Sequence, residues 1–130
     1  KGVQEVEKLL QSPDETTRVT AFRALKQTYA TPNPMNSPEL RGMIQLLVTD
    51  PSPAVRREVA IVLRDAPFDE CRQELAALIT QYNGSDPYYL TALGIASWRK
   101  GEAIYDMLKP LLPADPTQWE QRMADVVWEI

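Results

Sequence analysis

Apolar residues recur along this chain with the spacing of amphipathic helices. In the segment 50–65, DPSPAVRREVAIVLRD, the apolar residues Val55, Val59 and Leu63 stand four residues apart. This spacing places them on one face of a helix, with the Arg and Glu residues between them mostly to the sides. The pattern therefore predicts a helix whose apolar face is buried against a neighbour.

Helix start signals precede most of the apolar stripes. In Ser52-Pro53, the Ser hydroxyl can cap a helix, and Pro fits the first helical position, where its missing N–H costs nothing. Related pairs occur elsewhere in the chain, at Ser12-Pro13, Ser37-Pro38, Asp86-Pro87 and Asp115-Pro116. The prolines therefore mark helix starts rather than a disordered, low-complexity segment.

The stripes define eight helical segments and no strand. They centre on Val6, Phe22, Ile44, Val59, Leu75, Leu93, Met107 and Val126. Alternation with a period of two, the pattern of a half-buried strand, is absent over any useful length. The expected fold class is therefore all-α, in one domain that spans residues 1–130.

The eight segments group into four pairs that suggest an internal repeat. Each pair carries an acid at or near a turn, at Asp14, Asp50, Asp86 and Asp115, with spacings of 36, 36 and 29 residues. The second helices of the first two pairs align as TRVTAFRAL and VRREVAIVL. Repetition at such a period is typical of solenoid folds.

The phrase D-x-S-P-x-V-R-x-x-V-A-x-x-L at 50–63 resembles a HEAT repeat, and a weaker version runs from Asp14 to Leu25. The resemblance implies an α-solenoid of about four antiparallel helix pairs, a HEAT/armadillo-like superhelix. In such repeats a turn Asp and a helix Arg form a ladder between units. That role carries over to Asp14, Asp50, Arg18 and Arg56, while Tyr89 stands where the third unit would have its Arg.

A second phrase, YNGSDPYYLTALGIASWRKGEAIYDML at 82–108, is similar to the helical-repeat region of large bacterial, planctomycete-type proteins. Those proteins combine a dehydrogenase-like propeller, HEAT repeats and a C-type haem domain. The resemblance implies that this chain is a fragment of a longer exported protein, located in the periplasm or outside the cell. It also implies that any dehydrogenase or haem chemistry belongs to other parts of the parent chain.

The composition removes most catalytic chemistry. The chain has no His, which excludes Ser-His-Asp and Cys-His catalysis, the usual zinc sites and C-x-x-C-H haem attachment. Its one Cys, Cys71, lies on an apolar stripe and is expected to be a buried, inert thiol. We therefore expect no catalytic residue, no cofactor, no metal and no small-molecule substrate. No run of about 18 apolar residues is present either, so no membrane insertion is expected.

Binding remains as the function of this segment. Candidate partner-binding residues are Arg56, Arg57, Tyr88, Tyr89, Trp98 and Arg99, because Tyr, Trp and Arg are favoured as interface anchors. The competing interpretation of Trp98 is core packing, and that of Arg56 is the ladder between repeats.

Two functions from different classes follow. The first is a non-catalytic scaffold that binds a protein partner or a flanking domain of its parent chain. The second is an enzyme of the HEAT-like DNA glycosylase kind, which needs a basic groove, aromatic clamps and an acid near the lesion. The net charge of −4 argues against the second function and against nucleic acid as a partner.

Overall fold

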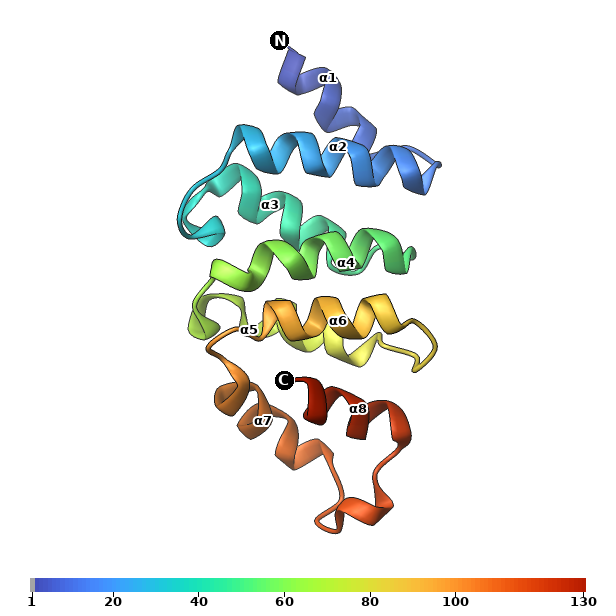
Figure 1. The fold of residues 1–130 in the computed structure, drawn as a ribbon. Helices are drawn as coiled ribbons and strands as arrows, with labels where there is room; N and C mark the ends of the chain where they lie inside the picture. Colours follow the sequence, from blue (N-terminus) through green and yellow to red (C-terminus); the bar gives the residue numbers. More distant parts are fainter. Residues whose placement is uncertain (1) are drawn as a thin grey trace.

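The computed structural model describes residues 2–130, and all regular structure in that range is helical (Figure 1). The eight α-helices are α1 (Gly2–Lys8), α2 (Glu15–Thr28), α3 (Pro38–Leu47), α4 (Pro53–Val62), α5 (Phe68–Thr80), α6 (Pro87–Ala96), α7 (Gly101–Leu108) and α8 (Gln121–Glu129). Short 3-10 turns occupy Leu9–Gln11, Pro34–Asn36, Leu63–Asp65, Lys109–Leu111 and Pro116–Gln118. The predicted all-α class and the eight helical segments are confirmed.

Three of the predicted helix starts are confirmed by their caps. The Ser37 hydroxyl accepts a hydrogen bond from the backbone N–H of Leu40 at 3.1 Å, and the Ser52 hydroxyl accepts one from that of Val55 at 3.4 Å. The Asp86 carboxylate accepts from the second and third residues of α6. In each case Pro occupies the first turn, as the sequence predicted.

Two predicted helix starts are wrong in detail. The cap of α2 is Asp14 rather than Ser12, and its carboxylate accepts from the N–H of Thr17 at 3.1 Å. Asp115 caps only a 3-10 turn, so Trp119 precedes α8 instead of lying in it. Asp and Ser can cap any turn, and the residues that follow decide whether the turn continues as an α-helix.

The even-numbered helices form one row. Contacts join α2 to α4, α4 to α6 and α6 to α8, and Figure 1 shows α2, α4 and α6 lying one beneath another. The helices α3 and α5 form a second layer, in which α3 packs against α2 and α4, and α5 against α4 and α6. On α2, α4 and α6, side chains that point neither to the second layer nor to a neighbouring helix of the row therefore lie on an open surface.

The apolar stripes meet between the two layers in one continuous core. Val59 and Leu63 are fully buried there, as the spacing predicted. Cys71 is also buried, and burial raises the pKa of its thiol to about 11. Gly94 lies where α6 approaches α8 closely, because a Cβ there would stand 2.7 Å from Oε2 of Glu129.

The expected Asp–Arg ladder forms at one rung. Nε and Nη2 of Arg18 donate to the two carboxylate oxygens of Asp50 at 2.9 and 3.0 Å, which ties α2 to the start of α4. The prediction is wrong for the other two positions. Asp14 caps its own helix, and Arg56 donates to the backbone carbonyl of Asp50 at 2.7 Å rather than to a carboxylate.

Among residues 2–130, no helix is both long and apolar enough to cross a membrane.

Candidate partner-binding surface

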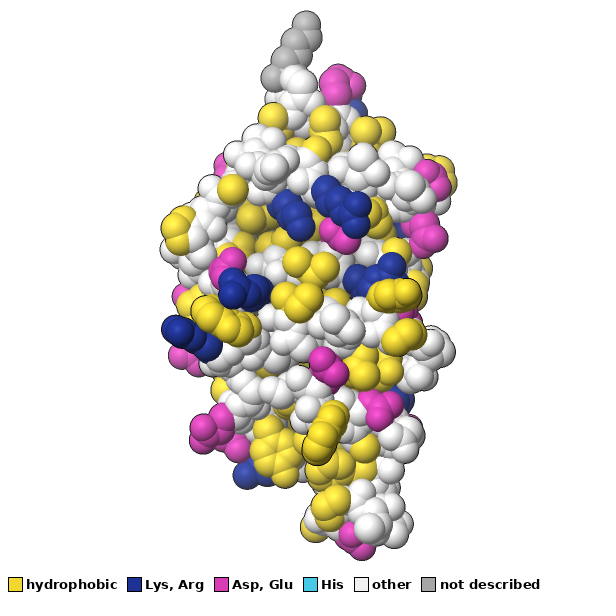
Figure 2. All heavy atoms as spheres, in the orientation of Figure 1, with side chains coloured by type: hydrophobic (Ala, Val, Ile, Leu, Met, Phe, Trp, Pro, Cys, Tyr) yellow, Lys and Arg dark blue, Asp and Glu magenta, His cyan; other side chains and the backbone are white. Residues whose placement is uncertain are grey.

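The side of α2, α4 and α6 that points away from α3 and α5 carries exposed apolar and basic side chains. We call this surface the even-helix face and define it by Arg23, Arg57, Ile61, Arg64, Tyr88, Ile95, Trp98 and Arg99. Figure 2 shows Lys and Arg side chains interspersed with hydrophobic ones over these helices. Large exposed apolar side chains in contact with such neighbours are the usual material of interaction surfaces.

Helical spacing explains why these residues share a surface. Arg57, Ile61 and Arg64 follow one another at i, i+4 and i+7, so they lie on one side of α4 and of the turn that continues it. Tyr88 and Ile95 are seven residues apart on α6. Both stripes stand opposite the buried stripes of the same helices, which turn toward α3 and α5.

A shallow groove of about 280 Å³ crosses the centre of the even-helix face. Its walls include Arg23 from α2, Arg57 and Ile61 from α4, and Tyr88 and Ile95 from α6. The groove therefore joins three helices that are far apart in the sequence. Apolar side chains and the guanidinium groups of Arg23 and Arg57 line it together.

Ion pairs hold the arginines of the groove in place. Nε and Nη2 of Arg23 donate to the two oxygens of Glu58, both at 2.9 Å. These hydrogen bonds lower the pKa of the Glu58 carboxyl, against the opposing effect of its burial. Arg57 donates through Nη1 to Asp86 at 2.6 Å, and its guanidinium carbon lies 5.9 Å from the centre of the Tyr88 ring.

Two of the predicted binding residues are buried instead. Arg56 donates through Nε to the Tyr89 hydroxyl at 3.3 Å, and that hydroxyl donates to the backbone carbonyl of Leu78 at 2.6 Å. The Tyr89 ring also stacks on Tyr82 with centroids 5.7 Å apart. Arg56 and Tyr89 therefore connect α4, α5 and α6 inside the protein, and neither offers an accessible surface to a partner.

The other four predicted residues lie at the surface, and the structure brings them into two pairs. Tyr88 has 74% of its surface exposed and stands beside Arg57 at the N-terminal end of α6. Trp98, 44% exposed, and Arg99 follow the C-terminal end of α6. The competing prediction of a Trp98 buried in the core is wrong.

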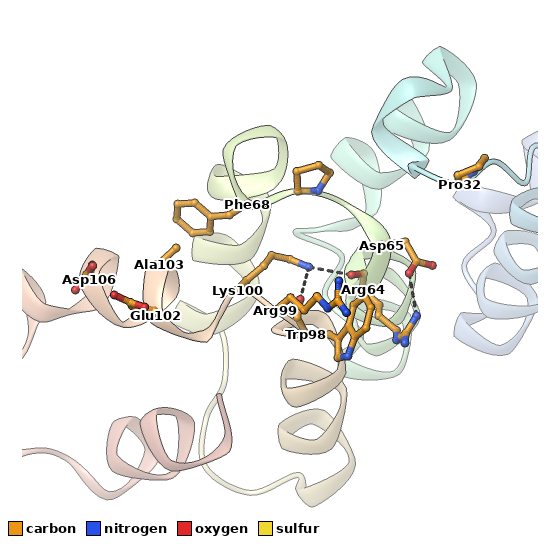
Figure 3. A pocket seen from close by; sticks show the side chains of 11 residues that line it. Pro32, Arg64, Asp65, Phe68, Trp98, Arg99, Lys100, Glu102, Ala103 and Asp106 are labelled. Atoms are coloured by element: carbon orange, nitrogen blue, oxygen red, sulfur yellow. Dashed lines mark hydrogen bonds and ion pairs between the residues drawn. The ribbon is translucent and has the colours of Figure 1, made fainter.

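Trp98 and Arg99 line a larger cleft of about 680 Å³, drawn in Figure 3. The guanidinium carbons of Arg64 and Arg99 lie 4.1 and 4.5 Å from the centre of the Trp98 ring, which are close cation–π distances. On the other side of the cleft stand Glu102 and Asp106 of α7. One wall is thus aromatic and basic, and the facing wall is acidic.

A buried lysine supports the basic wall from behind. The Lys100 ammonium donates to the backbone carbonyls of Leu63 at 3.1 Å and Arg64 at 3.0 Å, where α4 ends, and also lies 3.4 Å from that of Trp98. Burial lowers the pKa of Lys100. The ammonium joins the end of α4 to the turn after α6, which fixes Arg64 and Trp98 next to each other.

Arg99 holds an unusual backbone conformation in this turn. Its φ is 61°, the left-handed region that Gly usually occupies at the end of a helix. A non-Gly residue in this region costs about 1–2 kcal/mol. The Arg99 side chain lies against Trp98.

The sequence did not identify Arg23, Ile61, Arg64 or Ile95 as surface-site residues. A signal for Ile61 and Ile95 was present, since each is a large apolar residue that falls outside the buried stripe of its helix. The two arginines had no such signal, because charged residues on the sides of a helix are ordinary. Their roles follow from the helices packed next to them.

The described residues present little else that could carry chemistry. Within residues 2–130, no group of three carboxylate or thiol side chains lies close enough together to hold a metal ion. A scan against protein-family models and searches of curated proteins and of solved structures find no match to this chain.

Proposed function

We propose that the chain is a HEAT-type α-solenoid of about four antiparallel helix pairs, part of a larger exported protein with a dehydrogenase-like propeller and a haem domain. A repeated local contact supports the repeat relationship. Arg18 donates through Nη1 to the carbonyl of Ser12, and Arg56 donates through Nη1 to that of Asp50, so both arginines reach back six residues. Both members of the contact recur 38 residues later, which is the offset of the aligned helices.

In this proposal the chain is a non-catalytic protein-interaction module, and its even-helix face binds a protein partner or a flanking domain of the parent chain. The observation that carries it is the set of exposed side chains on that face. Four large apolar side chains are exposed there, namely Tyr88, Trp98, Ile61 and Ile95. Tyr88 and Trp98 lie under guanidinium groups, and Ile61 and Ile95 share the groove with Arg23 and Arg57. Repeat proteins use extended surfaces of this kind for binding, because each unit packs only on its neighbours.

A titration against the flanking domains of the parent chain tests the proposal. We expect those domains, purified separately, to bind this chain in isothermal titration calorimetry. The double variant Tyr88→Ala/Trp98→Ala should weaken binding at least about tenfold, equivalent to about 1.4 kcal/mol. Leu46→Ala is the matched control, because Leu46 is exposed on α3, outside the even-helix face. No binding, or equal loss in both variants, would remove the proposal.

The same preparation tests the alternative function of a DNA glycosylase. Under the proposal, duplex DNA added at low salt does not change the fluorescence anisotropy or the melting temperature of the chain. Salt-sensitive DNA binding that the Trp98→Ala variant abolishes would favour the enzyme instead.

A further inference from the structure

We infer that the even-helix face binds an extended peptide segment in which acidic and apolar residues alternate. The inference rests on the proposed function and adds the chemistry of the partner. Carboxylates of the peptide contact the guanidinium groups of the face, and its apolar side chains enter the groove between Ile61 and Ile95.

The charge of the face differs in sign from that of the chain. The whole protein carries a net charge of −4. On α2, α4, α6 and the turns that follow them, five cations on or beside the face stand against three carboxylates, namely Arg23, Lys26, Arg57, Arg64 and Arg99 against Glu58, Asp65 and Asp86. The two further carboxylates near the face, Glu102 and Asp106, belong to α7, on the facing wall of the cleft. An acidic segment that lies over α2, α4 and α6 is therefore attracted by this excess of positive charge, while the rest of the chain is net negative.

The guanidinium groups keep donors available for a ligand. Arg23 uses only Nε and Nη2 on Glu58, and Arg64 uses only Nη1, on Asp65 at 2.9 Å. Arg99 makes no side-chain hydrogen bond or ion pair with residues 2–130, and its guanidinium lies over the ring of Trp98. Since a guanidinium has five N–H donors in a fixed fork, each of these groups can donate to a carboxylate of a ligand without breaking its present contacts.

The strain at Arg99 is independent support for this site. A Gly at that position, in the turn after α6, would adopt the left-handed conformation at no steric cost, yet an arginine with a φ of 61° occupies it. Residues with such strained backbone conformations cluster at active sites and ligand-binding sites. Here the strain sets a guanidinium over Trp98 at the mouth of the cleft.

The alternation of acidic and apolar residues follows from the layout of the face. The apolar side chains of Ile61 and Ile95 line the groove next to the guanidinium groups of Arg23 and Arg57. Neighbouring helix axes are about 8–10 Å apart, so the path from α2 to α6 covers about 16–20 Å. An extended chain rises about 3.3 Å per residue, and about six residues span that distance.

The carboxylates near the face favour a peptide over a nucleic acid. Glu58 and Asp86 lie within the row of arginines, and Glu102 and Asp106 form the facing wall of the cleft. A strand with a phosphate at every nucleotide would bring negative charges against these groups. A peptide with spaced carboxylates and apolar residues between them avoids that repulsion.

Fluorescence anisotropy with labelled synthetic peptides tests the inference. The probe is a peptide of about nine residues with alternating Glu and Leu, long enough to exceed the required span. We expect it to bind at least about tenfold tighter than the same peptide with Lys for Glu or with Ser for Leu. Binding should weaken as salt is raised toward about 1 M, because exposed charges are then screened within about 3 Å.

Matched variants localise the binding. Arg64→Gln/Arg99→Gln should lose at least about tenfold in affinity for the Glu–Leu peptide. Arg41→Gln/Arg72→Gln, which removes two exposed arginines from α3 and α5, should keep it. Circular dichroism melting of each variant shows whether its fold is intact before the affinities are compared.

The other possible results of these experiments separate the inference about the peptide from the proposed function. Equal affinity for the Glu–Leu and Lys–Leu peptides, equal loss in both variants, or tighter binding of an oligothymidine of equal length overturns the inference. If the flanking domains still bind through Tyr88 and Trp98 in that case, the proposed function stands and only the partner chemistry is wrong. If neither the flanking domains nor the peptide bind, the proposed function and the inference about the peptide are both wrong.

Discussion

Replacement of Lys100 by Met tests how the basic wall of the cleft is held. Lys100 is only 6% exposed, and its ammonium donates to the carbonyls of Leu63 and Arg64. The Leu63 carbonyl also accepts from the backbone N–H of Ala66 at 3.0 Å, whereas Pro67, three residues after Arg64, has no N–H to donate to the Arg64 carbonyl. Met fills a similar volume, so the substitution removes the donors and the charge while largely keeping the packing.

The expected loss follows from the Arg64 carbonyl, 3.0 Å from the ammonium, because the Leu63 carbonyl keeps its hydrogen bond from Ala66. A buried acceptor left without a partner costs about 1–3 kcal/mol. Removing a buried ammonium also removes its desolvation penalty, which is the cause of its lowered pKa. The free energy of unfolding should therefore fall by about 1–2 kcal/mol, the lower part of the range.

Urea unfolding followed by far-ultraviolet circular dichroism measures this difference, and Lys109→Met is the control. The Lys109 ammonium lies 3.3 Å from Asp106 on an exposed part of α7, so its removal should change stability by no more than about 0.5 kcal/mol. Near-equal effects of the two variants would refute the assignment of Lys100 as a structural donor.

The pH dependence provides a second measurement for Lys100. Its folded-state pKa lies below the usual 10.5, so between these two values the unfolded chain binds more protons than the folded one. The stability of the wild type relative to Lys100→Met should therefore rise as pH increases toward 10.5. If the difference in stability between the wild type and Lys100→Met does not change with pH, folding does not desolvate the lysine.

Three further predictions concern the core, a helix and an ion pair. Leu63→Ala should cost about 2–5 kcal/mol in urea unfolding because Leu63 is fully buried, whereas Leu111→Ala, at an exposed site, should cost less than about 0.5 kcal/mol; equal costs would contradict the register of α4. Gly42→Ala should raise the free energy of unfolding by about 0.5–1 kcal/mol, since a Cβ at this site in α3 meets nothing within 4 Å. A lower free energy of unfolding would contradict the open space around this site. Hydrogen bonds from Arg23 lower the folded-state pKa of Glu58 below 4.5, so the stability that Glu58 contributes is present above pH 4.5 and is lost as pH falls through the folded pKa. The stability difference between the wild type and Glu58→Gln should accordingly shrink between pH 7 and pH 3, and an unchanged difference would contradict the pairing.

The placement of the arginines illustrates where prediction from the sequence ended. Arg56 and Arg57 are neighbours on α4, and each was a candidate for binding. Consecutive residues of a helix differ by about 100° in direction, so one of the two turns inward and the other outward. Tyr88 and Tyr89 divide in the same way. Which member of each pair is buried depends on the side from which α5 packs, and the sequence of the pair itself carries no information on that.

The sequence by itself determined the helices, most of their starting residues and the apolar stripes that form the core. These features depend on interactions within a few residues, such as the cap of Ser52 on Val55 and the spacing of Val59 and Leu63. Local hydrogen bonds and helical periodicity are encoded by adjacent positions, so they can be predicted from them.

Apart from Arg18 and Asp50, which the resemblance to repeats had brought together, only the tertiary structure decided which polar residues meet. The pairing of Arg23 with Glu58 and of Lys100 with the end of α4 joins positions 35 to 37 residues apart. Such contacts arise when helices stack and must satisfy every polar group that becomes buried. The even-helix face depends on the same packing, because burial of one side of α2, α4 and α6 leaves the other side to form a surface.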